Sequence, residues 1–179
     1  MRKITQIFIY SIVVLGFFMS SGCKKKSLIS FNIQVSQQFT IQSTNPIQLP
    51  FSILIPDVQT NSNAEFEKND SRVEYVKEIK LNEFRLQIES PIDQSFDFLK
   101  EIEIFIASEG LDEIRLASKF DINNNARTLD LDCETNDFSA YLKKESFKLR
   151  VRTVLRKTIN KDIKILSNQN FRVKAGLKD

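Results

Sequence analysis

The chain of 179 residues contains no histidine and no tryptophan, and only four glycines. The absence of histidine excludes Ser-His and Cys-His nucleophile pairs and every histidine-ligated metal site. With only Gly110 and Gly176 after residue 22, no glycine-rich phosphate loop and no G-x-S-x-G turn can be built. Paired carboxylates of the glycosidase type remain open among the 23 acidic residues, but no spacing singles out a pair. We therefore predict a protein that is not an enzyme and has no cofactor.

Cysteine is also scarce, because Cys23 and Cys133 are the only two. A zinc site built from a cluster of cysteines is therefore excluded. If Cys23 serves another purpose, Cys133 has no partner for an intramolecular disulfide, even in an oxidising compartment. Cys133 shares strand parity with Leu129 and Leu131, which predicts a buried and unreactive thiol.

The residues before Cys23 have the pattern of an export signal. Residues 1–3 are Met-Arg-Lys, and residues 4–19 are mostly apolar. This run is too short and too interrupted to cross the roughly 30 Å of membrane hydrocarbon, which takes about 20 apolar residues. It has the proportions of the apolar region of a signal peptide, and the small residues at 20–22 suit the narrow subsite of a signal peptidase.

The sequence Ser-Ser-Gly-Cys at residues 20–23 resembles the lipobox of bacterial lipoproteins, in a looser form that has serine in place of the usual leucine. The resemblance implies that the Cys23 thiol carries an acyl chain such as palmitate and that residues 1–22 are removed. Residues 23–28 are then the lipidated cysteine and a basic tether, and residues 29–179 are a single domain. The alternative is an ordinary secretory signal followed by a cysteine without lipid.

The resemblance also implies a place in the cell. The looser lipobox and the composition, rich in lysine, asparagine, isoleucine and phenylalanine, are similar to those of small uncharacterised Bacteroidota lipoproteins. In that group, acidic residues soon after the lipidated cysteine resemble a signal for export to the cell surface, and here three lysines occupy residues 24–26. We therefore expect a lipid-anchored protein of the cell envelope, on the periplasmic face of the outer membrane.

The balance of charge does not point to nucleic acid. The chain has 26 lysines and arginines against 23 acidic residues, and removal of the two basic residues at 1–22 leaves 24 against 23. Setting aside the three lysines of the tether leaves 21 against 23, so the body is slightly acidic. A nucleic-acid-binding domain carries a concentrated basic surface, which this balance does not provide. We expect no nucleic-acid partner.

Hydrophobic alternation predicts a fold made of β-strands. Regular or weaker patterns of this kind occur at residues 29–35, 47–55, 79–89, 102–106, 114–122, 129–133, 147–155, 163–166 and 171–175. In one of them the parity slips near Asn82 and Glu83, which predicts a β-bulge. The three asparagines at 123–125 predict the turn of a β-hairpin. About seven to nine strands without βαβ alternation predict an antiparallel β-sandwich, immunoglobulin-like or similar.

One or two short helices are expected beside these strands. Ser71 and Glu74 have the spacing of a capping box, which predicts a helical turn at residues 71–76. A second helical segment is expected at 137–144, where the apolar residues would face the core. The polar run at 59–69 predicts a long surface loop.

The predicted strand at 147–155 carries the first candidate interaction surface. The basic residues at or just beyond its outward positions are Lys148, Arg150, Arg152 and Arg156. Such a row attracts lipid head groups or an acidic protein. The alternative, which we favour, is pairing with acidic residues of a neighbouring strand, such as Glu101 and Glu103.

A second candidate is a stretch spaced like a calcium-binding loop. The residues at its first, third, fifth and twelfth positions are Asp121, Asn123, Asn125 and Asp132. However, the sixth position is alanine instead of glycine, the twelfth lacks the longer glutamate, and no helices are expected on either side. We therefore favour a polar turn with solvated acids and predict no metal site.

The aromatic residues do not indicate a sugar-binding platform, because Tyr75 and Tyr141 are the only aromatic residues after residue 22 besides the phenylalanines. We therefore expect a membrane-anchored envelope lipoprotein that acts as a non-catalytic interaction or structural module. An accessory subunit of a membrane assembly, with a protein partner in the envelope, is one such role. The alternative is a solute-binding or glycan-binding lipoprotein.

Overall fold

The computed structural model describes residues 27–123 and 125–178, and the structural statements below refer to these residues. The predicted signal peptide and Cys23 lie outside them. The expectation of a mainly β protein with short helices is confirmed. No helix in the described part of the chain is long and apolar enough to span a membrane.

In chain order, the strands are β1 (Leu28–Ile41), β2 (Phe51–Gln59), β3 (Val76–Ser90), β4 (Leu99–Ser108), β5 (Leu111–Lys119), β6 (Thr128–Asp130), β7 (Asp132–Cys133), β8 (Ser146–Leu155) and β9 (Ile163–Gly176). The helices are α2 (Ser62–Lys68) and α3 (Ser139–Leu142), and single 3-10 turns, η2 (Val73–Tyr75) and η3 (Phe96–Phe98), precede β3 and β4.

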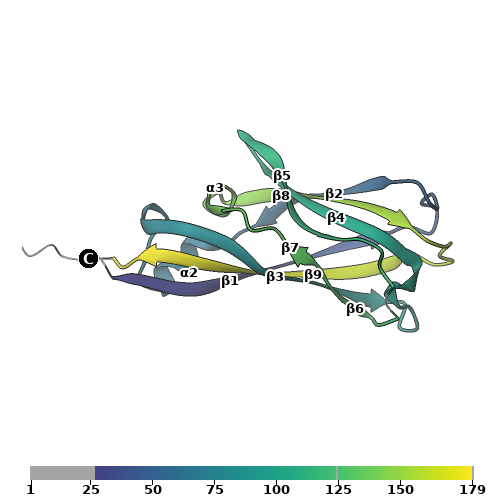
Figure 1. The fold of residues 1–179 in the computed structure, drawn as a ribbon. Coiled ribbons are helices and arrows are strands. Elements are labelled where there is room, and N and C mark those ends of the chain that lie inside the picture. The colour runs from purple at the N-terminus through teal and green to yellow at the C-terminus, as the bar shows by residue number, and fades with distance from the viewer. Residues whose placement is uncertain (1–26, 124, 179) are drawn as a thin grey trace, which may run out of the picture.

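Two antiparallel sheets pack face to face, which confirms the predicted β-sandwich (Figure 1). Sheet A has the strand order β1-β9-β3-β6, and sheet B has the order β2-β8-β4-β5-β7. The strand pairs are nested like those of one long hairpin: β4 pairs with β5, β3 with β6, β2 with β8 and β1 with β9. Rolling this hairpin so that successive pairs alternate between the sheets is the connectivity of a jelly roll. The sandwich is therefore of that type, not of the immunoglobulin type.

The hydrophobic core lies between the sheets and is built from the alternating positions predicted for the strands. On β4 and β8, Ile104 and Val151 face each other in register, and both are fully buried. Each such side chain contributes about 1.5–3 kcal/mol through the removal of apolar area from water. The predicted bulge is also present, since the pairing of β3 with β9 shifts between Leu81 and Glu83.

Several predicted boundaries are wrong. The segments at 163–166 and 171–175 are one continuous strand, β9. The predicted loop at 59–69 contains α2, whose Phe66 is buried and meets Phe31 edge to face at 6.1 Å. The turn expected from the capping box is the 3-10 turn η2, and the Ser71 hydroxyl does not cap it but donates to the Gly176 carbonyl at 2.8 Å.

The predicted hairpin around 123–125 is also wrong, because β5 and β6 belong to different sheets. Leu129 on β6 pairs with Leu86 in sheet A, whereas Cys133 on β7 pairs with Ala117 in sheet B. The segment therefore crosses the sandwich and closes one of its sides. Phe120 lies within the strand pattern predicted at 114–122 and has the inward parity of Leu116, but it is 48% exposed because β5 ends one residue earlier, at Lys119.

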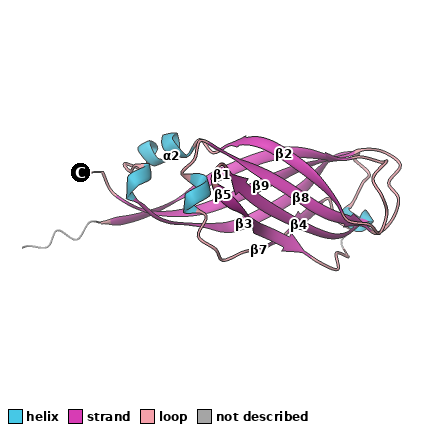
Figure 2. Ribbon diagram, turned by 90° about the horizontal axis from the view of Figure 1, so that it is seen from above, coloured by secondary structure: helices cyan, strands magenta, loops and turns pink. Residues whose placement is uncertain are grey.

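Both ends of the described chain lie at one end of the sandwich, which we call the proximal end (Figure 1). The Leu177 amide donates to the Ser27 carbonyl at 3.3 Å, and α2 lies at the same end (Figure 2). At the opposite, distal end, four loops connect the sheets: residues 42–50, 91–98, 120–127 and 156–162.

Candidate functional site

The predicted basic row lies partly on the outer face of sheet B. Lys148, Arg150 and Arg152 alternate on β8 with buried residues and point away from the core. Arg156 does not continue the row, because it follows the end of β8, and its guanidinium donates to the Ile122 carbonyl at 2.7 Å. The surface therefore consists of three basic residues instead of four.

Arg150 is held from two sides. Its guanidinium lies over the Phe105 ring at 4.3 Å from the ring centroid, and its Nε donates to Glu113 Oε2 at 2.9 Å. The hydrogen bond from Arg150 lowers the pKa of the Glu113 carboxyl, and the same bond raises the pKa of Arg150. Glu113 lies on β5, two strands away from β8, so Arg150 reaches it across the aromatic ring on β4.

Arg152 belongs to a second group of ion pairs on the same face. It donates to Glu103 at 2.8 Å, and this confirms one of the partners that the sequence suggested. Arg115 also approaches Glu103, at 3.4 Å, and donates to Glu134 at 2.6 Å, which raises the pKa of Arg115. Together with Arg150 and Glu113, three arginines face three glutamates. The two arginines of the row are therefore electrically compensated and do not form an anion-binding patch.

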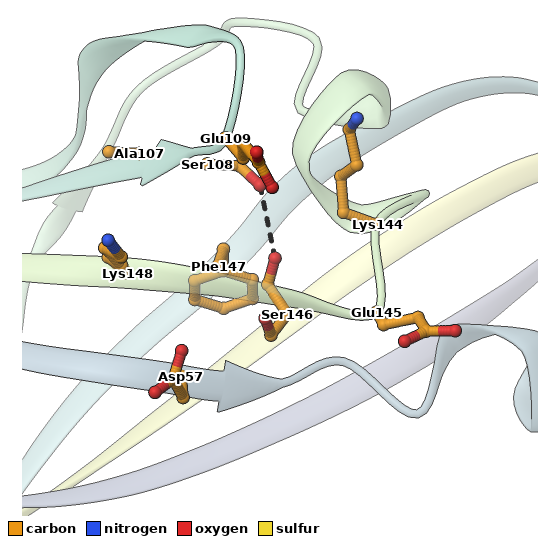
Figure 3. A pocket seen from close by; sticks show the side chains of 9 residues that line it. All are labelled: Asp57, Ala107, Ser108, Glu109, Lys144, Glu145, Ser146, Phe147 and Lys148. Atoms are coloured by element: carbon orange, nitrogen blue, oxygen red, sulfur yellow. Dashed lines mark hydrogen bonds between the residues drawn. The ribbon is translucent and has the colours of Figure 1, made fainter.

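An open cleft of about 750 Å³ lies where β2, β4 and β8 reach the proximal end (Figure 3). The side chains around it are Asp57, Ala107, Ser108, Glu109, Lys144, Glu145, Ser146, Phe147 and Lys148. Its charged groups are of both signs and point in different directions in Figure 3. Phe147 is only 1% exposed, so its ring offers no face on which a sugar could stack. The cleft therefore favours no ligand class.

A smaller hollow of about 300 Å³ lies on the outer face of sheet A. The residues that line it are Gln34, Ser36, Glu83, Arg85, Gln87, Asn168, Gln169 and Asn170. The Ser36 hydroxyl donates to Asn168 Oδ1 at 2.7 Å, while the buried Asn170 Oδ1 has no hydrogen-bond partner among the described residues. Amides can both donate and accept, so this hollow suits a neutral polar ligand better than the cleft does.

The residues spaced like a calcium loop are not gathered into a metal site. Asp132 lies on β7, where the Lys119 ammonium donates to its carboxylate at 2.9 Å. Asp121 stands at a positive φ of 48° beyond the end of β5. Across residues 27–123 and 125–178, no group of three or more acidic, cysteine or histidine residues could hold a metal ion.

Cys133 is half-buried, so the prediction of full burial is wrong in degree. It packs against the core from β7, the short edge strand of sheet B, and the edge position leaves its outer side open. Burial raises the pKa of its thiol, and nearby acidic residues such as Asp132 add to this effect. Both effects disfavour the reactive thiolate.

Comparisons with known proteins add no functional assignment. No protein-family model matches the chain, and no curated protein matches it. Among solved structures, a chain of desmodium yellow mottle tymovirus has a TM-score of 0.29 and 8% identity, covering 86% of this chain and 90% of its own. A chain of turnip yellow mosaic virus has a TM-score of 0.26 and 7% identity, covering 82% and 96%. Likeness at this level carries no argument about what the protein does.

Proposed function

We propose that the protein is a lipid-anchored lipoprotein of the cell envelope and acts there as a non-catalytic interaction module. The observation that carries the proposal is the Ser-Ser-Gly-Cys sequence at residues 20–23, followed by only a short stretch of chain before the folded body. Only four residues separate Cys23 from Leu28, the first residue of β1. At 3.3–3.6 Å per residue, the start of β1 lies at most about 18 Å from an acylated Cys23. The proximal end would therefore rest near the bilayer.

The surface of the proximal end agrees with this placement. Leu28 is 64% exposed and Leu177 is 36% exposed, and the two lie beside each other at the ends of β1 and β9. Lys178 follows directly and is exposed as well. Exposed apolar side chains with a neighbouring cation suit the interface of a membrane that carries anionic head groups.

The distal end would then face away from the bilayer and towards partners. Hydrogen bonds connect its loops: the Arg156 amide donates to the Phe98 carbonyl at 2.7 Å, and the Phe96 amide to the Ala126 carbonyl at 3.0 Å. The large apolar side chains exposed on these loops are Ile47, Leu49, Ile92 and Phe120. Apolar tips on well-supported loops suit contacts with another protein.

The anchor is tested by replacing Cys23. In cells fed a fatty-acid analogue, the wild-type chain should be labelled, and Cys23→Ser should lose the label and give an uncleaved or soluble form. Cys133→Ser is the matched control and should be labelled like the wild type. Equal labelling of wild type and Cys23→Ser would overturn the proposal. Added protease should spare the body on intact cells if it lies on the periplasmic face of the outer membrane, whereas digestion would reverse the proposed sidedness.

A solute- or glycan-binding role is the second candidate, and the polar hollow on sheet A favours it. Its test is binding of a panel of neutral oligosaccharides to the full chain, measured by calorimetry. Gln87→Ala and Asn170→Ala should each weaken any binding at this hollow, and Lys148→Ala, at the cleft on sheet B, is the control. If no oligosaccharide binds, or if both hollow variants bind as tightly as the wild type, the glycan role at this site is excluded.

A further inference from the structure

Strand β1 presents a long hydrogen-bonding edge that no strand of the described chain covers. It pairs with β9 along all 14 of its residues and stands at the end of sheet A. Its sequence, LISFNIQVSQQFTI, contains no charge, proline or glycine. Backbone N–H and C=O groups on such an edge form a template for pairing with another chain.

The other edges in the described part of the chain are protected. The pairing of β2, at one edge of sheet B, breaks between Ile55 and Val58, where Pro56 lacks an amide hydrogen and Asp57 takes a positive φ of 52°. At the opposite edges, β6 and β7 have only three and two residues. Natural sheets commonly use short strands, bulges, prolines and charges to prevent unwanted pairing. β1 has none of these devices.

Four incompletely covered apolar side chains, which we call the seam, lie on the same side of the sandwich, two at the proximal end of β1 and two at the distal end of β2. Ile29 and Phe31 on β1, and Phe51 and Ile53 on β2, pack against the core but remain partly exposed. On the central strands the corresponding inward positions, such as Ile104 and Val173, are fully buried. The crossing segment of β6 and β7 closes the opposite side. On the side bounded by β1 and β2, Ile33, Val35, Phe39 and Ile41 are buried, and Phe66 of α2 lies against Phe31. This side is therefore incompletely covered at the seam residues and closed along its middle.

We propose that β1 accepts an extended segment of another envelope protein by β-strand addition. The added strand would pair with the free edge of β1 and extend sheet A to five strands. Its inward side chains would be apolar and cover Phe31 and the rest of the seam. Its outward side chains would be polar and largely uncharged, because they would lie beside Asn32, Gln34 and Ser36.

Geometry argues against a second copy of this chain as the occupant, and this step rests on the proposed lipid anchor. A symmetric pair of β1 strands would be antiparallel, so the two proximal ends would point in opposite directions. A strand of 14 residues spans about 46 Å at roughly 3.3 Å per residue. The two acylated cysteines would then lie at opposite ends of the dimer. With the distal ends directed away from the bilayer, as proposed above, both cysteines could not enter the same membrane leaflet while the strands are paired.

The experiment uses the full chain in its own membrane, with a photoreactive amino acid at Gln34 or Ser36. Gln87, an exposed glutamine on the same face but on the interior strand β3, is the matched control. Gln34 and Ser36 should crosslink to one segment of one partner, at sites about two residues apart, and that segment should alternate between apolar and polar residues. Crosslinking from Gln87 should be weaker by tenfold or more.

Hydrogen exchange on the purified complex distinguishes strand addition from a contact of side chains only. In the free chain, the β1 amides that point away from β9 should exchange rapidly, and they should become protected at least tenfold in the complex. Unchanged exchange, absence of a crosslink, crosslinks only between copies of β1, or a charged partner segment would each overturn the proposal. Fatty-acid labelling of the same samples separates the two proposals: loss of the label refutes the anchor, whereas labelled protein without a crosslink refutes only the strand addition.

Discussion

Replacing Gln169 with leucine should stabilise the protein. Gln169 lies in the middle of β9, in register with Val35 on one side and Phe84 on the other, and it is only 2% exposed. Neither Nε2 nor Oε1 of its amide has a hydrogen-bond partner among the described residues. A buried amide without partners carries its full desolvation cost, about 1–3 kcal/mol.

The size of the effect follows from that cost. Leucine has a similar volume and no polar atoms, so Gln169→Leu should raise the free energy of unfolding by about 1–3 kcal/mol. For a protein of this size, each kcal/mol corresponds to about 2–4 °C in Tm. Ser167→Ala is the matched control on the same buried face of β9, because the Ser167 hydroxyl donates to the Gln37 carbonyl at 2.9 Å. That variant should lose about 1 kcal/mol.

Urea titration at constant pH, followed by far-ultraviolet circular dichroism, gives both free energies of unfolding. If Gln169→Leu is less stable than the wild type while Ser167→Ala behaves as expected, the reasoning is refuted. The amide would then have partners in solution, such as buried water, that satisfy its hydrogen bonds. If Gln169→Leu is more stable but crosslinks more weakly from Gln34 or Ser36 on β1, the Gln169 amide lowers stability but supports the pairing of the neighbouring strand β1 with its partner.

Three further predictions concern charge and the thiol. Reversal of Arg150 and Arg152 to glutamate should lower the free energy of unfolding by about 1–2 kcal/mol in urea titrations, since exposed ion pairs contribute under about 1 kcal/mol each. Partner proteins should still co-purify, and loss of a partner from a folded variant would make β8 the interaction face. The pKa of Glu113 is lowered in the folded state from 4.5, so its contribution to the free energy of unfolding is full above that pH and is lost as the pH falls through the folded value. Glu113→Gln should flatten this part of the plot of stability against pH, and an unchanged slope would contradict the assignment. Cys133 should react at least tenfold more slowly with a polar thiol reagent in native than in urea-unfolded protein, and equal rates would show an open thiol.

The strands that could be predicted are those in which every second residue is apolar and buried. β4 and β8 lie in the middle of sheet B and have clean alternation, and the slip at Asn82 and Glu83 corresponds to a real bulge. The pattern splits β9 in two because Ser167 and Gln169 occupy inward positions. Polar residues in a core interrupt the hydrophobic pattern even though the strand continues, so pattern alone could not join the segments.

The acidic partners of the basic row are set by the order of strands in sheet B. The alternation of apolar and polar residues in the sequence does not reveal this order. Glu103 could be suggested because it lies on a strand with matching parity, and it does bind Arg152. Glu113 could not be predicted as a partner of Arg150 from the sequence. Its approach to Arg150 requires β5 to lie beside β4 and Phe105 to lie between the two charges. The false hairpin at 123–125 has the same origin, since local turn chemistry does not say whether the next strand joins the same sheet.

The free edge of β1 can be recognised only from the sequence and the sheet topology together. β1 is the only strand in the described chain without a charged residue, and this is visible in the sequence, but it has no special meaning for a central strand. Only the sheet order places this strand at an edge, where lack of charge is unusual. An uncharged strand in that position exposes backbone groups that water can satisfy in the free protein but that a partner strand can also use. Pairing would exchange one set of hydrogen bonds for another at little net gain, so most of the affinity must come from covering Phe31 at the proximal end of the seam and Phe51 at its distal end. A partner that lacks apolar side chains at alternate positions should therefore bind weakly, however well its backbone fits.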